Sequence, residues 1–275
     1  MPRKAKIFFD TSVCIDVARG TVPAQEWNAI AQTIRRKYTY VISPLTGYEL
    51  IAGLHTGQPE FFNQNREALR VLYPAGKKKV LPVLKVFVPF QLFGERRAPG
   101  PATPNLDLWI RMVLKSKDRA SLESGQMKVG AGRRKLGLDL GNVNKQMRDI
   151  ENGYATYFRR FVDAEVPDLT RELWVDFVLK EYDEEFRLNH RDLVAVRTDA
   201  AYHFSVTLWR LAKDPRYNIH RYKSELVDAQ QLYYLCDENL VFLTSDSRLK
   251  NKILMSTQAN RVLTLDEVRS GSVLP

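Results

Sequence analysis

Short apolar runs alternate with amphipathic stretches at both ends of this chain. Four runs have the length of a strand and are bounded by polar or turn residues: 6–10, 38–42, 240–244 and 261–265. Beside them, apolar residues recur every three to four positions, which is typical of helices with one buried face. Strands that alternate with helices in this way predict βα units around a mostly parallel sheet.

The helices expected beside these strands have recognisable ends. Thr11 or Ser12 can cap the first helix, and an interruption around 20–23 separates it from a second helical pattern. Near the C-terminus the spacing predicts helices over 224–236 and 247–254. We expect the tail after the last strand to be frayed.

The middle of the chain, residues 57–221, has a different character. Six prolines in 74–105 argue against long helices there, although 80–90 can contain a strand. Five glycines in 120–142 predict a mobile loop. Three later stretches have helical spacing, over 143–161, 173–182 and 190–213. Asp199 on the last of these can point at a site, but a solvated helix residue is the favoured interpretation.

Four short motifs place one carboxylate at the end of an apolar run or on the helix beside it. The carboxylates are Asp10, Glu49, Asp228 and Asp246. The carboxyl ends of parallel strands meet at one edge of an α/β sheet, where ligands bind, so we expect these side chains to gather there. Carboxylate oxygens are hard ligands that suit Mg²⁺ or Mn²⁺. The pattern therefore predicts a metal site.

In order and position, these motifs resemble those of PIN-domain nucleases. The motifs that carry the resemblance are Asp10-Thr11-Ser12, Glu49, Asp228-Ala229 and Thr244-Ser245-Asp246. The first two carboxylates are 39 residues apart and the last two 18, which is similar to small members of the family. The 179 residues from Glu49 to Asp228 are far more than such members have, and they indicate a large insertion.

The resemblance implies a PIN-like α/β fold, in which a three-layer, mostly parallel sheet is flanked by helices. It assigns residues 1–56 and 222–275 to the nuclease core. The segment 57–221 would then be a mainly helical, basic insertion. It also implies Mg²⁺- or Mn²⁺-dependent hydrolysis of phosphodiester bonds, with RNA preferred over DNA.

The same resemblance gives the four carboxylates their roles as catalytic, metal-binding residues. A divalent ion can activate water and compensate charge on the phosphoryl group without a histidine base. Asp10 and Asp246 would be direct ligands, and Asp228 would bind directly or through water. Glu49 would orient the attacking water or complete a second metal site. Neighbouring hydroxyl groups would hold the carboxylates in place, namely Thr11, Ser12, Thr244 and Ser245.

Each carboxylate also has a purely structural interpretation. Asp10 and Asp228 can cap or open a helix. Asp246 can be a turn residue. Glu49 is harder to explain without a function, because it lies in an apolar helix and buried carboxylates are rare unless they are paired.

The charge of the chain favours a polyanionic partner. It has 42 Lys and Arg against 32 Asp and Glu, a net charge of +10 and a pI near 9.5. Ten basic against three acidic residues fall within 111–148. Basic side chains on phosphates release counterions, so nucleic acid is the expected partner. Candidate phosphate contacts, with solvated loops as the alternative, are Lys77, Lys78, Lys79, Arg96, Arg97, Arg133, Arg134 and Lys135.

We therefore expect a cytoplasmic, RNA-binding ribonuclease that is not membrane-bound. No apolar run approaches the ~20 residues of a membrane-spanning helix, and the apolar run near the N-terminus is too short for a signal peptide. One alternative is a non-cleaving PIN-like module that binds nucleic acid or protein. Another is an α/β phosphatase with an aspartyl nucleophile, although Ser12 interrupts the Asp-x-Asp pair it would need. The insertion can instead serve a homodimer or a protein partner.

Overall fold

The computed structural model divides the chain into two compact units. The first comprises residues 1–81 and 103–148, and the second comprises 82–102 and 149–275. The structure describes residues 4–55, 58–74, 79–94, 106–124, 126–129, 132–135, 138–163, 168–182, 190–214, 216–218 and 224–271.

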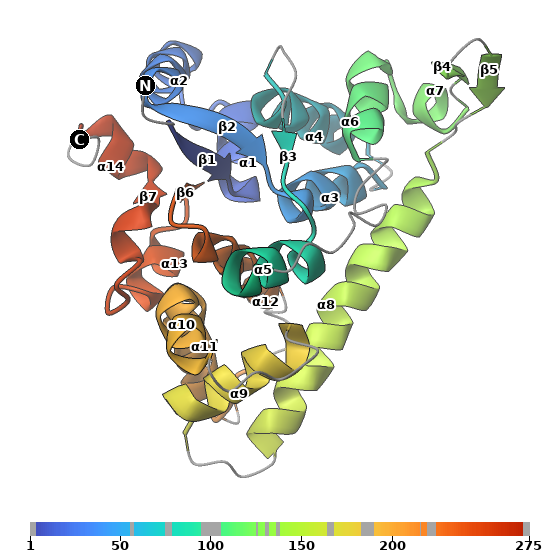
Figure 1. Cartoon of the computed structure of the whole chain (residues 1–275). Coiled ribbons are helices and arrows are strands. Elements are labelled where there is room, and N and C mark those ends of the chain that lie inside the picture. Colours follow the sequence, from blue (N-terminus) through green and yellow to red (C-terminus); the bar gives the residue numbers. More distant parts are fainter. Residues whose placement is uncertain are drawn as a thin grey trace. The chain divides into compact units, whose positions relative to one another are not determined.

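Three parallel strands form the centre of the first unit (Figure 1). They are β1 (Ala5–Phe9), β2 (Tyr38–Ile42) and β3 (Lys79–Val80), in the order β3-β2-β1. The last three residues of β1, Ile7 to Phe9, are at most 1% exposed. Such a continuous apolar run is expected of a parallel strand that is covered on both faces.

Helices connect and flank these strands. They are α1 (Thr11–Arg19), α2 (Ala24–Lys37), α3 (Pro44–Ala52), the 3₁₀ turn η1 (Gly53–His55), α4 (Pro59–Leu72), α6 (Leu106–Lys115) and α7 (Arg119–Glu123). The break between α1 and α2 is confirmed, because Gly20 ends α1 in the left-handed conformation, with φ of 74°. A two-stranded antiparallel hairpin follows, formed by β4 (Gln126–Val129) and β5 (Gly132–Lys135).

The second unit has two parallel strands among helices. The strands are β6 (Leu240–Thr244) and β7 (Val262–Thr264). The helices and 3₁₀ turns are α5 (Leu84–Phe93), α9 (Arg171–Tyr182), α10 (Arg191–Arg197), α11 (Asp199–Ala212), α12 (Ser224–Leu232), η3 (Tyr233–Cys236), α13 (Ser247–Lys252), η4 (Ala259–Arg261) and α14 (Leu265–Arg269). The long helix α8 (Leu140–Asp163) begins in the first unit, and its residues from Asp149 belong to the second.

The predicted α/β class is therefore confirmed: parallel strands are flanked by helices in both units. Strands β2 and β6 have the predicted bounds, and the helical spacing over 143–161 and 173–182 falls within α8 and α9. The boundaries proposed for the core and the insertion stay a prediction. Among the described residues, no helix is long and apolar enough to cross a membrane.

The strand expected within 80–90 is confirmed only at its start, because β3 ends at Val80 and Leu84–Phe93 is the helix α5. Leu84, Phe87 and Val88 are buried at helical spacing, although Pro89 lies inside the helix. A short apolar run cannot be assigned to strand or helix from its periodicity alone.

The region 120–142, predicted as a loop, contains the end of α7, the hairpin and the start of α8. The sequence of β4, Gln126-Met127-Lys128-Val129, alternates polar and apolar residues as a strand does. The many glycines around this four-residue alternation were interpreted as a loop. Glycines beside short strands are, however, also typical of hairpin turns.

The single helix predicted over 190–213 is broken at Thr198 into α10 and α11. The Thr198 hydroxyl donates to the Val194 carbonyl at 2.7 Å and accepts from the Trp174 indole at 2.9 Å. Val194 on α10 is buried, whereas Val196 on the same helix is 62% exposed. Threonine competes with the helix for backbone hydrogen bonds, which explains a break at this position.

The predicted frayed tail was also wrong, because α14 follows β7. Thr264 and Glu267 form a capping box: the Glu267 carboxylate accepts from the Thr264 amide at 2.8 Å, and the Thr264 hydroxyl accepts from the Glu267 amide at 3.3 Å. This Thr-x-x-Glu signature is visible in the sequence.

Candidate active site

Asp10 lies where β1 ends and α1 begins, and it caps the helix. Its Oδ1 accepts the Thr11 amide at 2.7 Å, and its Oδ2 accepts the Ser12 hydroxyl at 2.5 Å. Asp10 itself is therefore the cap, and the expectation that Thr11 or Ser12 caps α1 was wrong. The carboxylate is only 5% exposed, so these hydrogen bonds fix its orientation in a buried position.

Glu49 on α3 is connected to the same cluster through Thr11. The Thr11 hydroxyl donates to Glu49 Oε2 at 2.5 Å, while its amide binds Asp10. The Thr46 hydroxyl donates to the Phe9 carbonyl at 2.8 Å and ties α3 to the end of β1. A Cβ on Gly47 would lie 3.0 Å from the Leu106 side chain, so α3 packs closely on α6. The structure thus brings Asp10 and Glu49 into one hydrogen-bonded chain.

The pKa of Cys14, one turn into α1, is affected by burial and by the charge of Asp10. Burial, and then the negative charge of Asp10, raise the pKa of the Cys14 thiol well above its ordinary value. A fully buried thiol that keeps its proton is a poor nucleophile. Cys14 therefore belongs to the packing beneath the carboxylates.

Asp246 in the second unit caps α13. Its Oδ1 accepts the Arg248 amide at 2.8 Å and the Arg248 Nε at 3.2 Å. The Asp246 amide donates to the Thr244 hydroxyl at 3.0 Å, and the predicted role of Thr244 in holding the carboxylate itself stays a prediction. Ser245 between them is half-buried.

Asp228 on α12 is half-buried, and its charge acts on Arg248. The hydrogen bond to Asp246 raises the pKa of Arg248, and the charges of Asp246, Glu225 and Asp228 raise it further. Glu225 also forms an ion pair with Lys252 at 2.6 Å. Sequence reasoning missed Glu225 and Arg248, although Glu225 lies three residues before Asp228 and therefore shares a helix face with it.

Asp10 and Glu49 in the first unit are thus joined through Thr11, whereas Asp228 and Asp246 in the second unit both raise the pKa of Arg248. Within the described part of the chain, no group of three or more His, Cys, Asp or Glu side chains is arranged to hold a metal ion. Mg²⁺ is commonly bound by one or two carboxylates together with substrate phosphates and waters. The oxygen donors of Asp10 and Glu49 fit that smaller requirement.

Most predicted phosphate contacts lie where side chains are not described. Lys77, Lys78, Arg96 and Arg97 are outside the described residues. Lys79 lies on β3, and Arg133, Arg134 and Lys135 lie on β5. Their role in binding phosphate stays a prediction.

Asp199, expected to be solvated, is 5% exposed and tightly bound. It forms an ion pair with Arg171 at 2.5 Å and accepts hydrogen bonds from Ser256 and Thr257. Burial would raise the pKa of Asp199, but the hydrogen bonds from Thr257, Arg171 and Ser256 outweigh it and lower the pKa. The prediction failed because these partners lie 28 to 58 residues away in the sequence.

No protein-family model, curated protein or solved structure matches this chain. We therefore infer a function from the link between Asp10 and Glu49 and from the charge of the chain.

Proposed function

We propose that this chain is a Mg²⁺- or Mn²⁺-dependent nuclease of the PIN-like type, with RNA as its preferred substrate. The observation that carries the proposal is the link from Asp10 through Thr11 to Glu49, where β1 ends. A buried carboxylate at the end of a parallel strand, tied to a second carboxylate on the helix that follows the neighbouring strand, suits an ion-binding site better than a helix cap alone.

The carboxylates would have distinct roles in phosphodiester hydrolysis. Asp10 would be a direct ligand of the ion. The roles of Asp246 as a direct ligand and of Asp228 as a direct or water-mediated ligand stay predictions. Glu49 would orient the attacking water, and the Thr11 hydroxyl would keep Glu49 in place. The ion, when bound, would lower the pKa of that water and compensate the charge that develops on the phosphoryl oxygens.

The net charge of +10 supports a nucleic-acid substrate. The excess of basic residues within 111–148 covers the hairpin, where Arg133, Arg134 and Lys135 form part of β5. Such groups would contact phosphates and would add affinity without reading bases.

A non-cleaving PIN-like module is the second candidate, and one observation favours it. Arg248 binds an oxygen of Asp246 that a metal ion would need. A guanidinium in that position neutralises the carboxylate. Binding without cleavage would then be the function of the same fold.

The test is incubation of the full chain with end-labelled RNA, single-stranded DNA and duplex DNA in Mg²⁺, Mn²⁺ or EDTA. We expect RNA to be cut fastest, only with a divalent ion, and not in EDTA. Binding of all three substrates without cleavage would favour the second candidate. Equal cleavage in EDTA would contradict the metal-dependent mechanism.

A further inference from the structure

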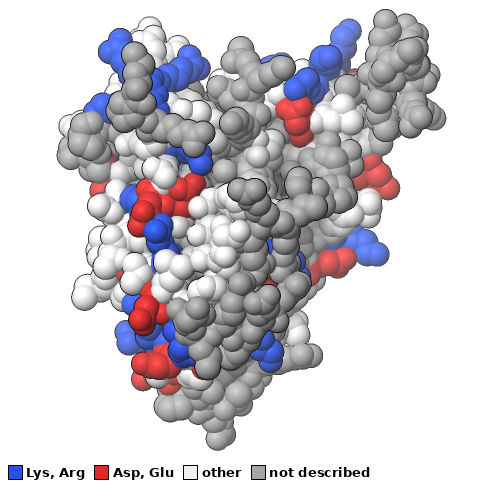
Figure 2. Space-filling view, viewed as in Figure 1, with Lys and Arg blue, Asp and Glu red and all other residues white. Residues whose placement is uncertain are grey.

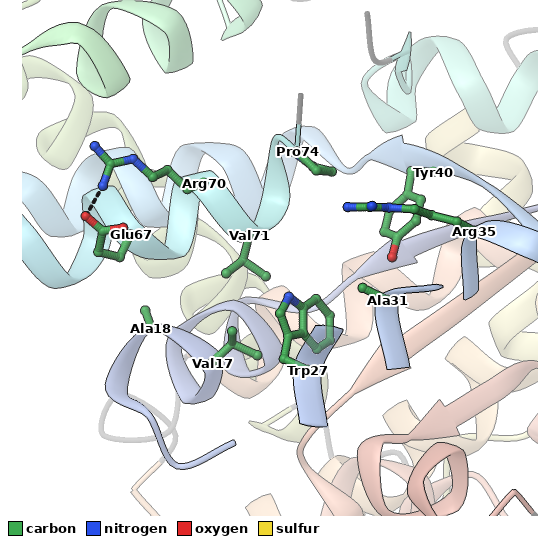
Figure 3. Close-up of a pocket in the computed structure, with 10 residues that line it drawn as sticks. All are labelled: Val17, Ala18, Trp27, Ala31, Arg35, Tyr40, Glu67, Arg70, Val71 and Pro74. Atoms are coloured by element: carbon green, nitrogen blue, oxygen red, sulfur yellow. Dashed lines mark hydrogen bonds and ion pairs between the residues drawn. The ribbon is translucent and has the colours of Figure 1, made fainter. Parts of the chain in front are cut away.

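A pocket in the first unit has no part in the proposed chemistry. It encloses about 320 Å³ between α1, α2, β2 and α4, and Figure 3 shows ten of the residues that line it. This volume is within the range of ligand pockets, roughly 300–1,000 Å³. Val17 and Ala18 line it from α1, whereas Asp10 precedes the same helix. Seven residues along a helix correspond to about 10 Å, so the pocket is separate from the carboxylate pair.

The floor of the pocket is apolar and aromatic. The Trp27 indole lies at its centre in Figure 3, among Val17, Ala31 and Val71. Trp27 is half-buried and packs edge-to-face on Phe9, with 5.8 Å between the ring centroids. A tryptophan that is anchored from beneath and partly exposed offers a rigid surface for a planar ring.

The rim of the pocket is polar and carries more positive than negative charge. Arg35 and Arg70 line it, together with Glu67, which is ion-paired with Arg70. Arg35 belongs to the basic last turn of α2, with Arg36 and Lys37. On the face seen in Figure 2, Lys and Arg side chains gather in the region of α2.

Tyr40 from β2 adds a hydroxyl group between floor and rim. Burial raises the pKa of Tyr40 to about 12, even though the charge of Arg35 lowers it. The hydroxyl therefore keeps its proton at neutral pH and is a polar group on the wall of the pocket. Aromatic surface, guanidinium groups and a phenol group are thus present in one pocket.

We infer that this pocket binds a nucleoside phosphate, with the base against Trp27 and the phosphate beside Arg35. Every base has a π-face, so stacking on Trp27 would accept any base. Guanidinium groups match the geometry of phosphate oxygens and can bind them in pairs. The site goes beyond the proposed nuclease function, because it requires neither a metal ion nor cleavage.

The experiment measures the binding of adenosine 5′-monophosphate, ribose 5-phosphate and adenosine to the full chain in EDTA, by calorimetry and tryptophan fluorescence. We expect the nucleotide to bind at least about five-fold more tightly than ribose 5-phosphate, since stacking one base contributes that much or more. Equal affinities for these two phosphates would overturn the proposal. Because EDTA removes divalent ions, nucleotide binding is measured without nuclease activity. A failure to bind nucleotide would therefore not contradict the proposed cleavage, and a failure to cleave RNA would not contradict the pocket.

Arg35→Gln and Arg36→Gln are a matched pair of variants, because both residues are exposed and lie in the last turn of α2, but only Arg35 lines the pocket. Arg35→Gln should weaken nucleotide binding roughly five-fold, whereas Arg36→Gln should leave it nearly unchanged. Equal losses in both variants would indicate attraction by the general positive charge and would overturn the site.

Trp27→Leu should abolish the preference for the nucleotide over ribose 5-phosphate, and Trp27→Phe should retain it. If Trp27→Leu does not fold, Trp27→Phe and the arginine pair still decide the matter. A short single-stranded RNA, compared with the mononucleotide in EDTA, distinguishes the source of the ligand. Tighter binding of the strand, lost in Arg35→Gln, assigns the pocket to a nucleic-acid chain; equal or weaker binding assigns it to a free nucleotide.

Discussion

Asp10 in the first unit and Asp199 in the second are equally buried, at 5% exposure, but they are held differently. The hydrogen bonds described for Asp10 come from neutral donors, the Thr11 amide and the Ser12 hydroxyl. Asp199 accepts similar bonds from Ser256 and Thr257 and, in addition, meets the Arg171 guanidinium at 2.5 Å.

The different donors around Asp10 and Asp199 suit two different roles of a buried carboxylate, a proposed cation ligand and a structural ion pair. A guanidinium compensates the charge of Asp199 and joins α9 to α11, which is a structural role. The two donors described for Asp10, an amide and a hydroxyl, are neutral and orient it in a way that suits a group proposed to bind a cation. Asp246 is intermediate, because its partner Arg248 is charged but 84% exposed and therefore screened by solvent.

The largest expected effect concerns stability at Asp199. Asp199→Ala leaves Arg171 without its buried partner and should cost about 3–5 kcal/mol of the free energy of unfolding. Urea denaturation measures it, with Asp192→Ala on the exposed surface of α10 as a control that should change stability by less than about 0.5 kcal/mol. If Asp199→Ala lowers the free energy of unfolding no more than the control does, Asp199 does not have the structural role assigned to it.

The next effect concerns the link between Asp10 and Glu49. Thr11→Val preserves the shape of the side chain but deletes the hydroxyl that donates to Glu49. Loss of such a supporting group typically costs 10–100-fold in metal affinity or activity, and we expect a reduction of about that size. Mn²⁺ titration and RNA cleavage measure it, and Thr33→Val on α2, whose hydroxyl bonds only to the Ala29 carbonyl among its described contacts, is the matched control. Wild-type behaviour of Thr11→Val would show that the link has no functional role.

The sequence reveals the catalytic candidates Asp10 and Glu49 more readily than it reveals the structural role of Asp199. Asp10 and Glu49 were found from the sequence because each follows a strand whose apolar run is easily recognised. Their hydrogen-bonded link was not predicted, because it needs the side-chain geometry of Thr11. The role of Asp199 was missed because its partners come from distant elements, and no local pattern encodes such a pairing.

The same distinction applies to the fold. Strands β2 and β6 were predicted with their observed bounds because strongly apolar runs end sharply at polar residues. The helix α5 and the hairpin of β4 and β5 were missed because proline and glycine obscured short local signals. Tertiary packing decides such segments, which carry too few residues for periodicity to discriminate.

A smaller effect is expected at Arg248, which competes with a metal ion for Asp246. Arg248→Gln should raise Mn²⁺ affinity by up to about five-fold, as expected for the loss of an exposed ion pair. Arg216→Gln is the matched control, because Arg216 is 90% exposed and pairs with Asp214 at the same spacing of two residues. Equal Mn²⁺ affinities in the two variants would show that Asp246 does not bind the ion.

The smallest effect is a pH dependence from His203, which lies beside Asp199. Burial lowers the pKa of His203 and Arg171 lowers it further, while Asp199 raises it. Because the folded pKa is below the unfolded value of about 6.5, the unfolded chain binds more protons just below that pH. Stability contributed by neutral His203 is therefore present above about pH 6.5 and lost on acidification. His203→Gln should flatten the unfolding free energy across this window, and an unchanged slope would contradict the assignment.

The central claim, that Asp10 is a catalytic carboxylate, is tested most directly by RNA cleavage in Mn²⁺ with Asp10→Asn and Asp16→Asn. Both variants remove one carboxylate charge at α1, but Asp16 lies outside the described cluster of Asp10, Thr11 and Glu49. The account predicts that Asp10→Asn loses more than about 100-fold in rate with little change in melting temperature, whereas Asp16→Asn retains wild-type activity. Cleavage by Asp10→Asn at the rate of Asp16→Asn would contradict it.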